Sequence, residues 1–427
     1  MKLLWSDQRE VSDDHDTAVL EGLQPHKNLQ YLKLENFMGE LFPNLTFVEN
    51  LVRISLKNCS RCRRIPTFGH LRNLKVLEIS GLHNLKSIGT EFYGNENEGR
   101  SLFPKLKRFD LLDMENLGRW DEAAVPSHVA VFPCIEELKI LDCPRLEIVP
   151  DYFSTLRTLE IDDVNNPVSQ NTLQTFKLLG IIHSGSLSGL PEELYGNLSS
   201  LEEFKVWYYH HLKSFPTIDW LTDLLKCKIG YDTKWTSNQA DELESYMSVN
   251  ELSIVGYHDL TSTPDIKALQ DLSSLTITGL KNLPKGFHCL TCLKSLSIGG
   301  FMEGFDFRPL LHLESLENLA LIDFGSAEST LPGELQHLTG LKHLKIVGFQ
   351  GIESLPEWFG NLTSLETLHL ESCRNLRELP EAMGCLAKLE ELRSFNCHEL
   401  RLRQEESEWS KISHVSRFIS FNYWVDE

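Results

Sequence analysis

Two pairs of cysteines have the Cys-x-x-Cys spacing from which structural zinc sites are built. They are Cys59 with Cys62 and Cys289 with Cys292. A structural zinc ion needs four ligands, so the two pairs would have to meet in space. Some 230 residues separate them along the chain, which puts them in distant parts of the fold. We therefore interpret these thiols as structural and predict no metal site.

Other residues that could do chemistry lack the partners that the chemistry requires. His210, His211 and His414 have no companion carboxylate in a His-Glu-x-x-His motif. The serines of the segment 185–189, Gly-Ser-Leu-Ser-Gly, do not occupy the nucleophile position of Gly-x-Ser-x-Gly. No Gly-x-x-x-x-Gly-Lys-Ser/Thr loop is present to hold a nucleotide phosphate. The sequence therefore predicts no enzyme and no cofactor.

The composition excludes several further classes of protein. A chain of 427 residues is longer than one compact core usually supports, which favours several domains or a repeat array. The net charge of −20 argues against nucleic-acid binding, because Lys and Arg make most contacts to phosphates. No apolar run reaches the length of a membrane span. Residues 1–6 lack the apolar core of a signal peptide, so we expect a cytoplasmic protein with reduced cysteines.

A leucine repeat runs along most of the chain. Two neighbouring units are Leu341-Lys-His-Leu344-Lys-Ile346 and Leu365-Glu-Thr-Leu368-His-Leu370. This Leu-x-x-Leu-x-Leu frame occurs 16 times with a mean spacing of 24 residues, within the range of about 20–29 known for leucine-rich repeats. The frames begin at Leu29, Leu51, Leu74, Leu106, Ile135, Leu156, Leu173, Leu201, Leu224, Val249, Leu272, Leu293, Leu316, Leu341, Leu365 and Leu389.

The repeat predicts an α/β solenoid. Alternating apolar residues point to one side of a strand and the residues between them to the other. One such strand cannot bury its apolar side alone, whereas a stack of parallel strands encloses a continuous core. We expect a leucine-rich-repeat horseshoe of about 16 coils, with one parallel sheet on the concave face. The predicted organisation is an entry segment over 1–28, the solenoid over 29–400 and a C-terminal tail over 401–427.

The pattern weakens at two places. Residues 162–200 fit it poorly, and the frame at Leu173 has the weakest match. The last frame, Leu389-Glu-Glu-Leu392-Arg-Ser394, has a polar residue in its third apolar position. This polar residue predicts a terminal repeat at which the stack ends.

The position three residues after the last strand leucine separates classes of repeat. Extracellular plant repeats have an asparagine ladder there, and this chain does not. The position is predicted to be buried, which explains four of the ten cysteines as small core residues. The residues at this position are Phe37, Cys59, Leu82, Met114, Cys143, Tyr257, Phe324, Phe349, Cys373 and Cys397.

Several segments beside the leucine frame form a recognisable set. They are Leu20-Glu-Gly-Leu-Gln-Pro-His26, Asn58-Cys59-Ser-Arg-Cys62, Phe68-Gly-His-Leu71, Glu91-Phe-Tyr-Gly94, Phe103-Pro-Lys-Leu106, Trp120, Phe132-Pro-Cys-Ile135, Asp142-Cys-Pro-Arg-Leu146 and Glu408-Trp409-Ser-Lys411-Ile412-Ser-His414-Val415. Together they resemble the repeat domain of plant coiled-coil nucleotide-binding leucine-rich-repeat disease resistance proteins. The resemblance extends from about Leu20 to Val415.

The resemblance implies a role in plant defence. It identifies the chain as similar to the sensor end of an intracellular immune receptor, which recognises a pathogen effector or a guarded host protein. It also implies that the repeats restrain a nucleotide-binding switch module of the same receptor. The phosphate-binding loop of that module is absent from this sequence.

Two other classes of protein remain as alternatives. An extracellular leucine-rich-repeat receptor ectodomain would need a signal peptide, glycans and disulfides at its ends. A leucine-rich-repeat substrate adaptor of a ubiquitin ligase would need a ligase-recruiting helix bundle before Leu20, for which 19 residues are too few. The sequence favours the immune-receptor interpretation over both.

A basic segment lies early in the array. Between Asn50 and Leu77 there are seven basic residues and no acidic one. This segment is either an ordinary solvated face or a docking patch for an acidic surface of the switch module. The predicted patch consists of Arg53, Lys57, Arg61, Arg63, Arg64 and Lys75, with Arg72 nearby.

An aromatic segment in the middle of the chain is the second candidate surface. Trp207 follows the strand residues Phe204 and Val206, so alternation places its ring on the concave face, with Tyr208 at the edge. Trp and Tyr are enriched in binding hot spots. The predicted partner-binding set is Trp207, Tyr208, Tyr231, Lys205 and Lys228. The alternative is stacking between neighbouring repeats.

Overall fold

The structure is a computed structural model. It describes residues 1–5, 13–22, 26, 28–42, 49–94, 101–126, 128–147, 149–150, 152–162, 177–183, 200–208, 224–231, 249–256, 266–279, 283–300, 305–323, 330–400 and 407–421. The chain divides into two compact units, the first centred on Met1–Gly185 and the second on Leu224–Glu427. Each unit is a stack of parallel strands, in agreement with the predicted solenoid.

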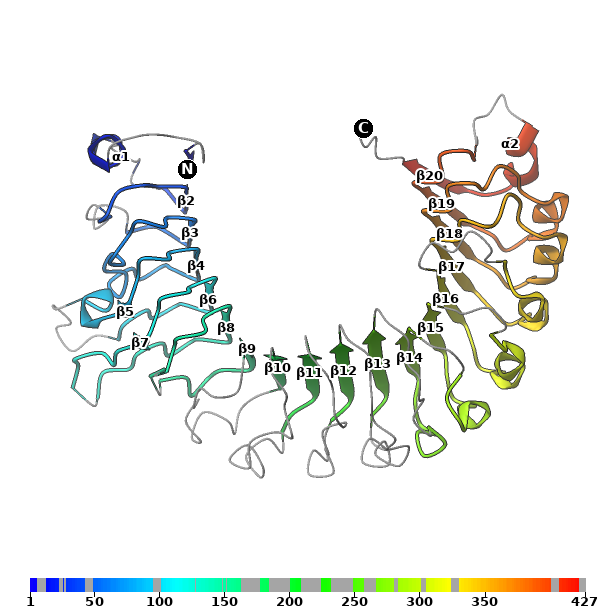
Figure 1. The fold of residues 1–427 in the computed structure, drawn as a ribbon, viewed down its shortest axis with the longest axis horizontal. Coiled ribbons are helices and arrows are strands. Elements are labelled where there is room, and N and C mark those ends of the chain that lie inside the picture. Colours follow the sequence, from blue (N-terminus) through cyan, green and yellow to red (C-terminus); the bar gives the residue numbers. More distant parts are fainter. Residues whose placement is uncertain are drawn as a thin grey trace. The chain divides into compact units, whose positions relative to one another are not determined.

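In the first unit, consecutive strands pair in parallel from β1 to β10 (Figure 1). The two-residue strands β5 (Ser87–Ile88) and β7 (Arg119–Trp120) form a separate small sheet. A helix α1 (Asp13–Gly22) and a short 3₁₀ helix η1 (Thr90–Phe92) complete the unit. The main strands are β1 (Lys2–Leu4), β2 (Tyr31–Glu35), β3 (Arg53–Lys57), β4 (Val76–Ser80), β6 (Arg108–Leu112), β8 (Glu137–Leu141), β9 (Thr158–Asp162), β10 (Leu178–His183) and β11 (Glu203–Tyr208).

The second unit repeats the arrangement with more regular connections. Its strands are β12 (Lys226–Tyr231), β13 (Glu251–Gly256), β14 (Ser274–Thr278), β15 (Ser295–Gly299), β16 (Asn318–Ile322), β17 (His343–Val347), β18 (Thr367–Glu371), β19 (Glu391–Phe395) and β20 (Arg417–Phe421). Short 3₁₀ helices form the return path: η5 (Phe287–Cys289), η6 (Arg308–His312), η7 (Gly333–His337), η8 (Glu357–Asn361) and η9 (Glu381–Cys385). A helix α2 (Ser407–Ile412) precedes the last strand.

Alternation along each strand separates core from solvent. In β17, Leu344 and Ile346 are 1% and 0% exposed, whereas the side chains between and beside them keep partial exposure. Proline directly precedes three of the 3₁₀ helices, with φ near −70° at Pro332, Pro356 and Pro380. Its missing N–H costs nothing there, because the first turn of a helix leaves N–H groups unpaired anyway.

The predicted core position after each strand is confirmed wherever it is described. Tyr257 and Phe324 lie outside the described residues. The others are 0–6% exposed: Phe37, Cys59, Leu82, Met114, Cys143, Phe349, Cys373 and Cys397. The residue before this position commonly has a positive φ, as in Asn58 (53°) and Gly348 (78°). Asn and Gly tolerate this left-handed conformation, which turns the chain sharply from the strand into the core.

The aromatic residues of the recognised segments form one stack in the core of the first unit. Phe92 packs on Phe103 with ring centroids 4.9 Å apart, and Phe103 packs on Phe132 at 4.8 Å. Trp120 meets Phe132 edge-on at 6.2 Å and donates its Nε1–H to Tyr93 Oη at 2.8 Å. These family-like residues therefore hold successive repeats together.

The predicted frame at Leu173 is wrong in register. It places a strand over 175–179 with Leu178 facing the core, whereas β10 extends from Leu178 to His183. Leu179 is buried and pairs with Leu159 of β9, so the frame begins three residues later than predicted. The irregular sequence allowed either register, and pairing with the neighbouring strand selects one. Leu173 itself lies outside the described residues.

The prediction that the stack ends at the frame of Leu389 is also wrong. Strand β20 pairs in parallel with β19, so the sheet continues into the segment predicted to be a tail. Ser394 is accommodated in the core position at 1% exposure. At the other end, β1 pairs with β2 and extends the sheet into the predicted entry segment.

Helix α2 covers the last turns and explains the Trp-x-Lys-Ile-x-His segment. Lys411 Nζ donates to Leu379 O at 2.7 Å and to Glu408 Oε1 at 2.9 Å. Glu408 Oε2 accepts the Leu379 N–H at 2.6 Å. Ile412 is buried, and Trp409 meets Phe418 of β20 edge-on at 5.7 Å. The segment is a structural cap over the end of the core.

Candidate functional site

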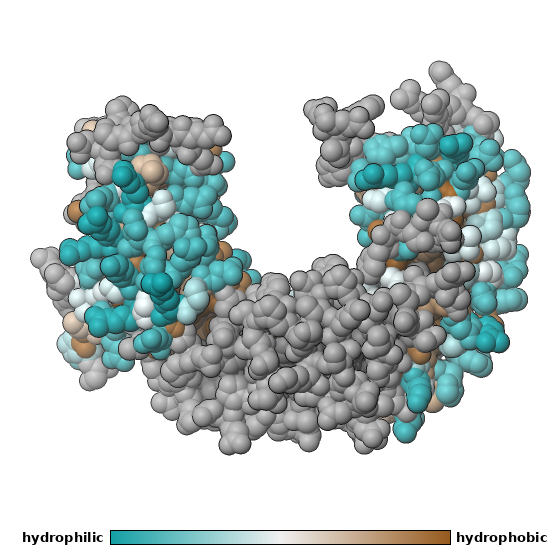
Figure 2. Space-filling model, viewed as in Figure 1, coloured by the Kyte–Doolittle hydropathy of each residue, from teal (hydrophilic) through white to brown (hydrophobic). Residues whose placement is uncertain are grey.

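In most five-residue strands, as in β17 and β18, the first, third and fifth residues face away from the core and form the open face of the sheet, although Ser55 and Asp110 in the third position are almost fully buried. Because the core uses the second and fourth, the open face can vary without loss of the fold. Hydrophilic residues cover most of the described surface in the view of Figure 2. The two open faces differ in how their charges are arranged.

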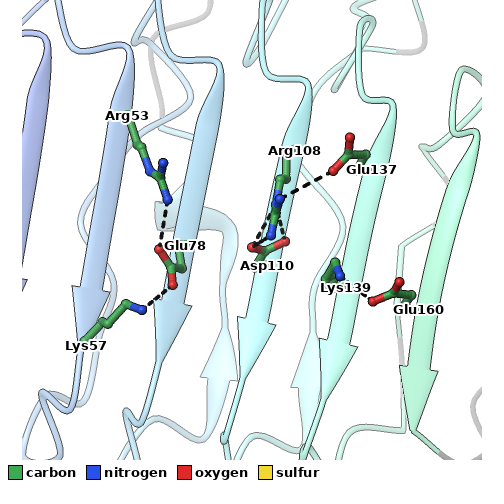
Figure 3. A network of polar contacts seen from close by, with 8 residues as sticks. All are labelled: Arg53, Lys57, Glu78, Arg108, Asp110, Glu137, Lys139 and Glu160. Atoms are coloured by element: carbon green, nitrogen blue, oxygen red, sulfur yellow. Dashed lines mark hydrogen bonds and ion pairs between the residues drawn. The ribbon is translucent and has the colours of Figure 1, made fainter. Parts of the chain in front are cut away.

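On the first unit, opposite charges alternate across neighbouring strands (Figure 3). Glu78 of β4 lies between two cations of β3, with Oε1 2.5 Å from Lys57 Nζ and Oε2 3.6 Å from Arg53. On β6, the Arg108 guanidinium contacts Asp110 Oδ2 at 2.8 Å and Glu137 Oε2 of β8 at 3.7 Å. Lys139 of β8 pairs with Glu160 of β9.

These pairs leave the charged ladder close to neutral. Burial opposes ionisation of Glu78, but the hydrogen bond and charge of Lys57 outweigh it and hold the pKa of that carboxyl below its usual range. Asp110 is only 3% exposed and is held by Arg108 within its own strand. Because its positive and negative charges are equal in number, this ladder has no net charge with which to attract a charged ligand.

The predicted basic patch divides among three places. Arg53 and Lys57 belong to this ladder and face Glu78. Arg61, Arg63 and Arg64 lie in the turn after β3, where all three are exposed and Arg63 contacts Glu40 at 3.1 Å. Lys75 and Arg72 are exposed just before β4. A docking role for the patch remains a prediction, and the turn arginines are its most accessible members.

The predicted aromatic surface is described only in part. Trp207 is 37% exposed, while Phe204 and Val206 are fully buried, so the alternation along β11 is as expected. Lys205 contacts Glu203 of the same strand at 3.3 Å. Lys228 is exposed on β12, which belongs to the second unit. The side chains of Tyr208 and Tyr231 lie outside the described residues, and the role of this set in binding remains a prediction.

The second unit has a hollow of about 300 Å³ on its open face. The surface is recessed there because the central residues of β15 and β16, Ser297 and Ala320, have small side chains. The next strands carry long side chains in the same row. We call Lys345, His369 and Arg393 the cationic row; they come from β17, β18 and β19, and each pairs with the next in the sheet register.

Two carboxylates adjoin the cationic row. Lys345 Nζ is 2.8 Å from Glu371 Oε2, and Arg393 contacts Glu391. His369 lies between the two cations, 3.7 Å from Glu371 Oε2, with its ring edge-on to Phe395 at 5.1 Å. Burial, followed by the positive charges of Lys345 and Arg393, lowers the pKa of His369 below its usual value.

Among the described residues, the cysteines and histidines form no site comparable with this surface. Cys59 and Cys62 are fully buried, and burial raises the pKa of the Cys59 thiol to about 12. In the described part of the chain, only His83, Asp113 and Glu115 group closely enough to hold a metal. The two carboxylates approach opposite nitrogens of His83, Nε2 at 3.8 Å and Nδ1 at 3.9 Å, which one ion cannot use together.

Comparison with known proteins identifies the repeats that this chain resembles. The R13L1/DRL21 leucine-rich-repeat family matches residues 1–82 and 323–397. RGA1, a Solanum bulbocastanum protein assigned to disease resistance, is 30% identical over 208 residues, which cover 48% of this chain and 20% of that protein. The RPP13-like protein 1 of Arabidopsis thaliana, also assigned to disease resistance, is 26% identical over 284 residues, covering 63% of this chain and 24% of that protein.

The chain is a leucine-rich-repeat solenoid whose repeats are similar to those of plant disease resistance proteins. It spans about a fifth to a quarter of the length of these curated relatives. Among solved structures, TLR13 from a TLR13–ssRNA13 complex aligns with a TM-score of 0.54 at 16% identity, covering 92% of this chain and 65% of that one. At such low identity the likeness concerns the fold alone. Among the described residues of the domain, no helix is long and apolar enough to cross a bilayer.

The sequence analysis did not predict the cationic row. A signal was nevertheless present, because Lys345, His369 and Arg393 are spaced 24 residues apart and occupy the same position after the frame leucines. Such residues form a row across parallel strands. The signal for this row is one position shared by successive repeats. The predicted patch within residues 53–75 rested instead on basic residues close together in the sequence.

Proposed function

We propose that this domain is the recognition part of an intracellular plant immune receptor. It binds a pathogen effector or a guarded host protein, and it restrains a nucleotide-binding switch module of the same receptor. In this proposal the domain is non-catalytic and works in the cytoplasm. Its similarity to plant disease resistance proteins supports a role in plant immunity.

The observation that carries the proposal is the separation of core and open face within each strand. In β17 the fold depends on Leu344 and Ile346, while His343, Lys345 and Val347 keep partial exposure on the open face. Open-face residues can therefore change to suit a partner at little cost to stability. Leucine-rich-repeat domains mediate protein interactions, and extended open surfaces of this kind suit that role.

The test is co-expression of the chain in leaf tissue with a panel of pathogen effectors, scored by direct binding and by cell death. We expect one effector or one host protein to bind and to trigger a response that depends on open-face residues. A response that is equally strong when this domain is deleted from the receptor would contradict the proposal.

The restraint of the switch module has its own test. Charge reversal to Glu at Arg61, Arg63 and Arg64 should weaken association with the separately expressed module, more so at low salt, because exposed charges are screened within about 8 Å at physiological ionic strength. Lys86→Glu, an exposed change outside the turn, serves as the control. Unchanged affinity of the triple variant would eliminate the docking role of these arginines.

A further inference from the structure

We propose that the hollow and the cationic row of the second unit bind an extended acidic segment of a protein partner. Carboxylates three residues apart on that segment pair with Lys345 and Arg393, while a neighbouring residue fills the hollow over Ser297 and Ala320. This inference rests on the proposed recognition function and names the class of partner.

The charge of this surface selects an acidic ligand. The chain as a whole has a net charge of −20, yet the four strands β17 to β20 carry three open-face cations, Lys345, Arg393 and Arg417, against two open-face carboxylates, Glu371 and Glu391. The ladder of the first unit has no such excess, because its four cations are balanced by four carboxylates. An acidic partner would therefore be steered toward the second unit.

The same carboxylates favour a singly charged group over a phosphate. Lys345 contacts Glu371 at 2.8 Å, and Arg393 contacts Glu391, which also lies 3.6 Å from Arg417. A carboxylate of the ligand can contact Lys345 and Arg393 alongside Glu371 and Glu391. A doubly charged phosphate would meet the repulsion of both glutamates at once.

The geometry favours an extended chain lying across the strands. Lys345 and Arg393 are on β17 and β19, two strands apart in register, which corresponds to about 10 Å at the usual strand spacing. A polyproline II segment rises about 3.1 Å per residue and presents every third side chain on the same side, so its repeat is about 9.3 Å. Acidic residues at positions i and i+3 of such a segment match the two cations.

The hollow suits part of a protein better than a free small molecule. Its lining comes entirely from the strands β15 to β19, so it is covered on one side only. Sites for small molecules enclose most of the ligand surface. A segment anchored in a larger partner does not need such enclosure, because contacts elsewhere add to its affinity.

The experiment measures fluorescence anisotropy of two labelled peptides with the full chain at low salt. One is acetyl-Gly-Glu-Pro-Pro-Glu-Pro-Gly-amide, and the other has Gln in place of both Glu. We expect the Glu peptide to bind about tenfold more tightly, a ratio that two exposed ion pairs can supply. The ratio should fall toward one in high salt.

Variants locate the binding surface. The double change Lys345→Gln with Arg393→Gln should abolish the preference for Glu. Lys342→Gln is the matched control, because Lys342 belongs to the same repeat and pairs with Glu317 outside the hollow at 3.1 Å. Thermal unfolding verifies that each variant is folded. Binding of the Glu peptide should also raise the pKa of His369, seen in its ring proton signals, because a carboxylate then lies beside the imidazole.

This inference would be overturned if the chain bound the two peptides with equal affinity. It would also be overturned if the double variant and Lys342→Gln lost equal affinity for the Glu peptide. Either result would leave the proposed function standing if an effector still bound the chain in leaf tissue. Conversely, selective binding of the Glu peptide by a chain that recognises no immune partner would remove the proposed function and keep the acidic-segment site.

Discussion

At the scale of single residues, position within a strand decides whether a side chain serves the fold or a partner. Phe204 and Val206 are fully buried, while Trp207, the next residue, is 37% exposed. On β18, Leu368 is likewise buried, whereas the next residue, His369, is partly exposed. Residues on the open face can therefore be changed to test function with little disturbance of the core.

Replacement of Trp207 by Ala should weaken partner recognition. Loss of a hot-spot ring typically costs roughly 2 kcal/mol or more of binding free energy, whereas an exposed substitution changes the free energy of unfolding by about 0.5 kcal/mol or less. Affinity for the cognate effector and the melting temperature are the two measurements. A large drop in melting temperature would show that the ring is part of the core and that local stacking is its role.

His369 should make the second unit less stable as the pH falls. Its pKa is lowered in the folded chain, first by burial and then by Lys345 and Arg393, so the unfolded chain binds the proton more readily. Stability is then lost as the pH falls through the unfolded value of about 6.5. Melting temperatures between pH 8 and pH 5 should decline more steeply for the natural chain than for His369→Gln. Parallel curves would contradict the assignment.

At the scale of elements, the solenoid is held together by contacts between turns. The aromatic stack in the first unit links η1, β6 and β7 to the segments that contain Phe103, Phe132 and Phe153. Phe109 and Trp120 meet edge-on at 5.2 Å. In the second unit, 3₁₀ helices replace the aromatic stack and bury one apolar residue each, such as Phe359 and Met383. Helix α2 then covers the last turns.

Trp120→Ala should destabilise the first unit strongly. The ring is fully buried against three aromatic rings, those of Phe109, Phe132 and Phe153, and such a truncation typically costs about 3–5 kcal/mol. Tyr93→Phe removes only the hydroxyl that accepts the Trp120 N–H at 2.8 Å, at a cost of about 1 kcal/mol. Urea unfolding followed by circular dichroism measures both. Equal effects of the two changes would mean that the hydrogen bond, rather than packing, dominates.

Lys411→Met should loosen the cap at the end of the second unit. The ammonium group is largely buried, and it donates to Leu379 O at 2.7 Å and pairs with Glu408. A hydrogen bond that involves a charged group contributes about 1.5–3 kcal/mol. Amide exchange in β19 and β20 should therefore accelerate, while the exposed control Lys388→Met leaves it unchanged. Unchanged exchange in both variants would show that Ile412 and Trp409 hold the cap without Lys411.

At the scale of the whole molecule, three surfaces stand out among the described residues. The charge ladder, the turn arginines and the hollow are all polar surfaces on a scaffold of stacked turns. The chain corresponds to about a fifth of the length of the relatives RGA1 and RGA2.

The isolated chain should not bind ATP in a saturable way. No Gly-x-x-x-x-Gly-Lys-Ser/Thr loop occurs in its 427 residues, and backbone N–H groups of that loop supply most phosphate contacts in such nucleotide sites. Isothermal titration calorimetry with Mg·ATP tests the prediction, and a nucleotide-binding switch module serves as the positive control. Saturable binding near one equivalent would refute it.

Much of the local structure follows from sequence alone. The leucine frame determined which strand residues enter the core, and the position of Cys59, Cys373 and Cys397 after the strands determined that these thiols are buried. Both follow from the two-residue period of a strand and from the small apolar character of the thiol. Those signals lie within single repeats, so they can be interpreted without knowing which strands pair with which.

Only the tertiary structure decided the register of β10, the continuation of the sheet into β20 and the place of the cationic row. Leu178 and Leu179 are equally apolar, and the pairing of Leu179 with Leu159 selects between them. Ser394 is polar and 1% exposed, yet β20 pairs with β19 beside it and the sheet continues. Lys345, His369 and Arg393 are distant in sequence and become one surface through strand pairing. Interactions between turns, which no single repeat contains, are the physical reason for all three.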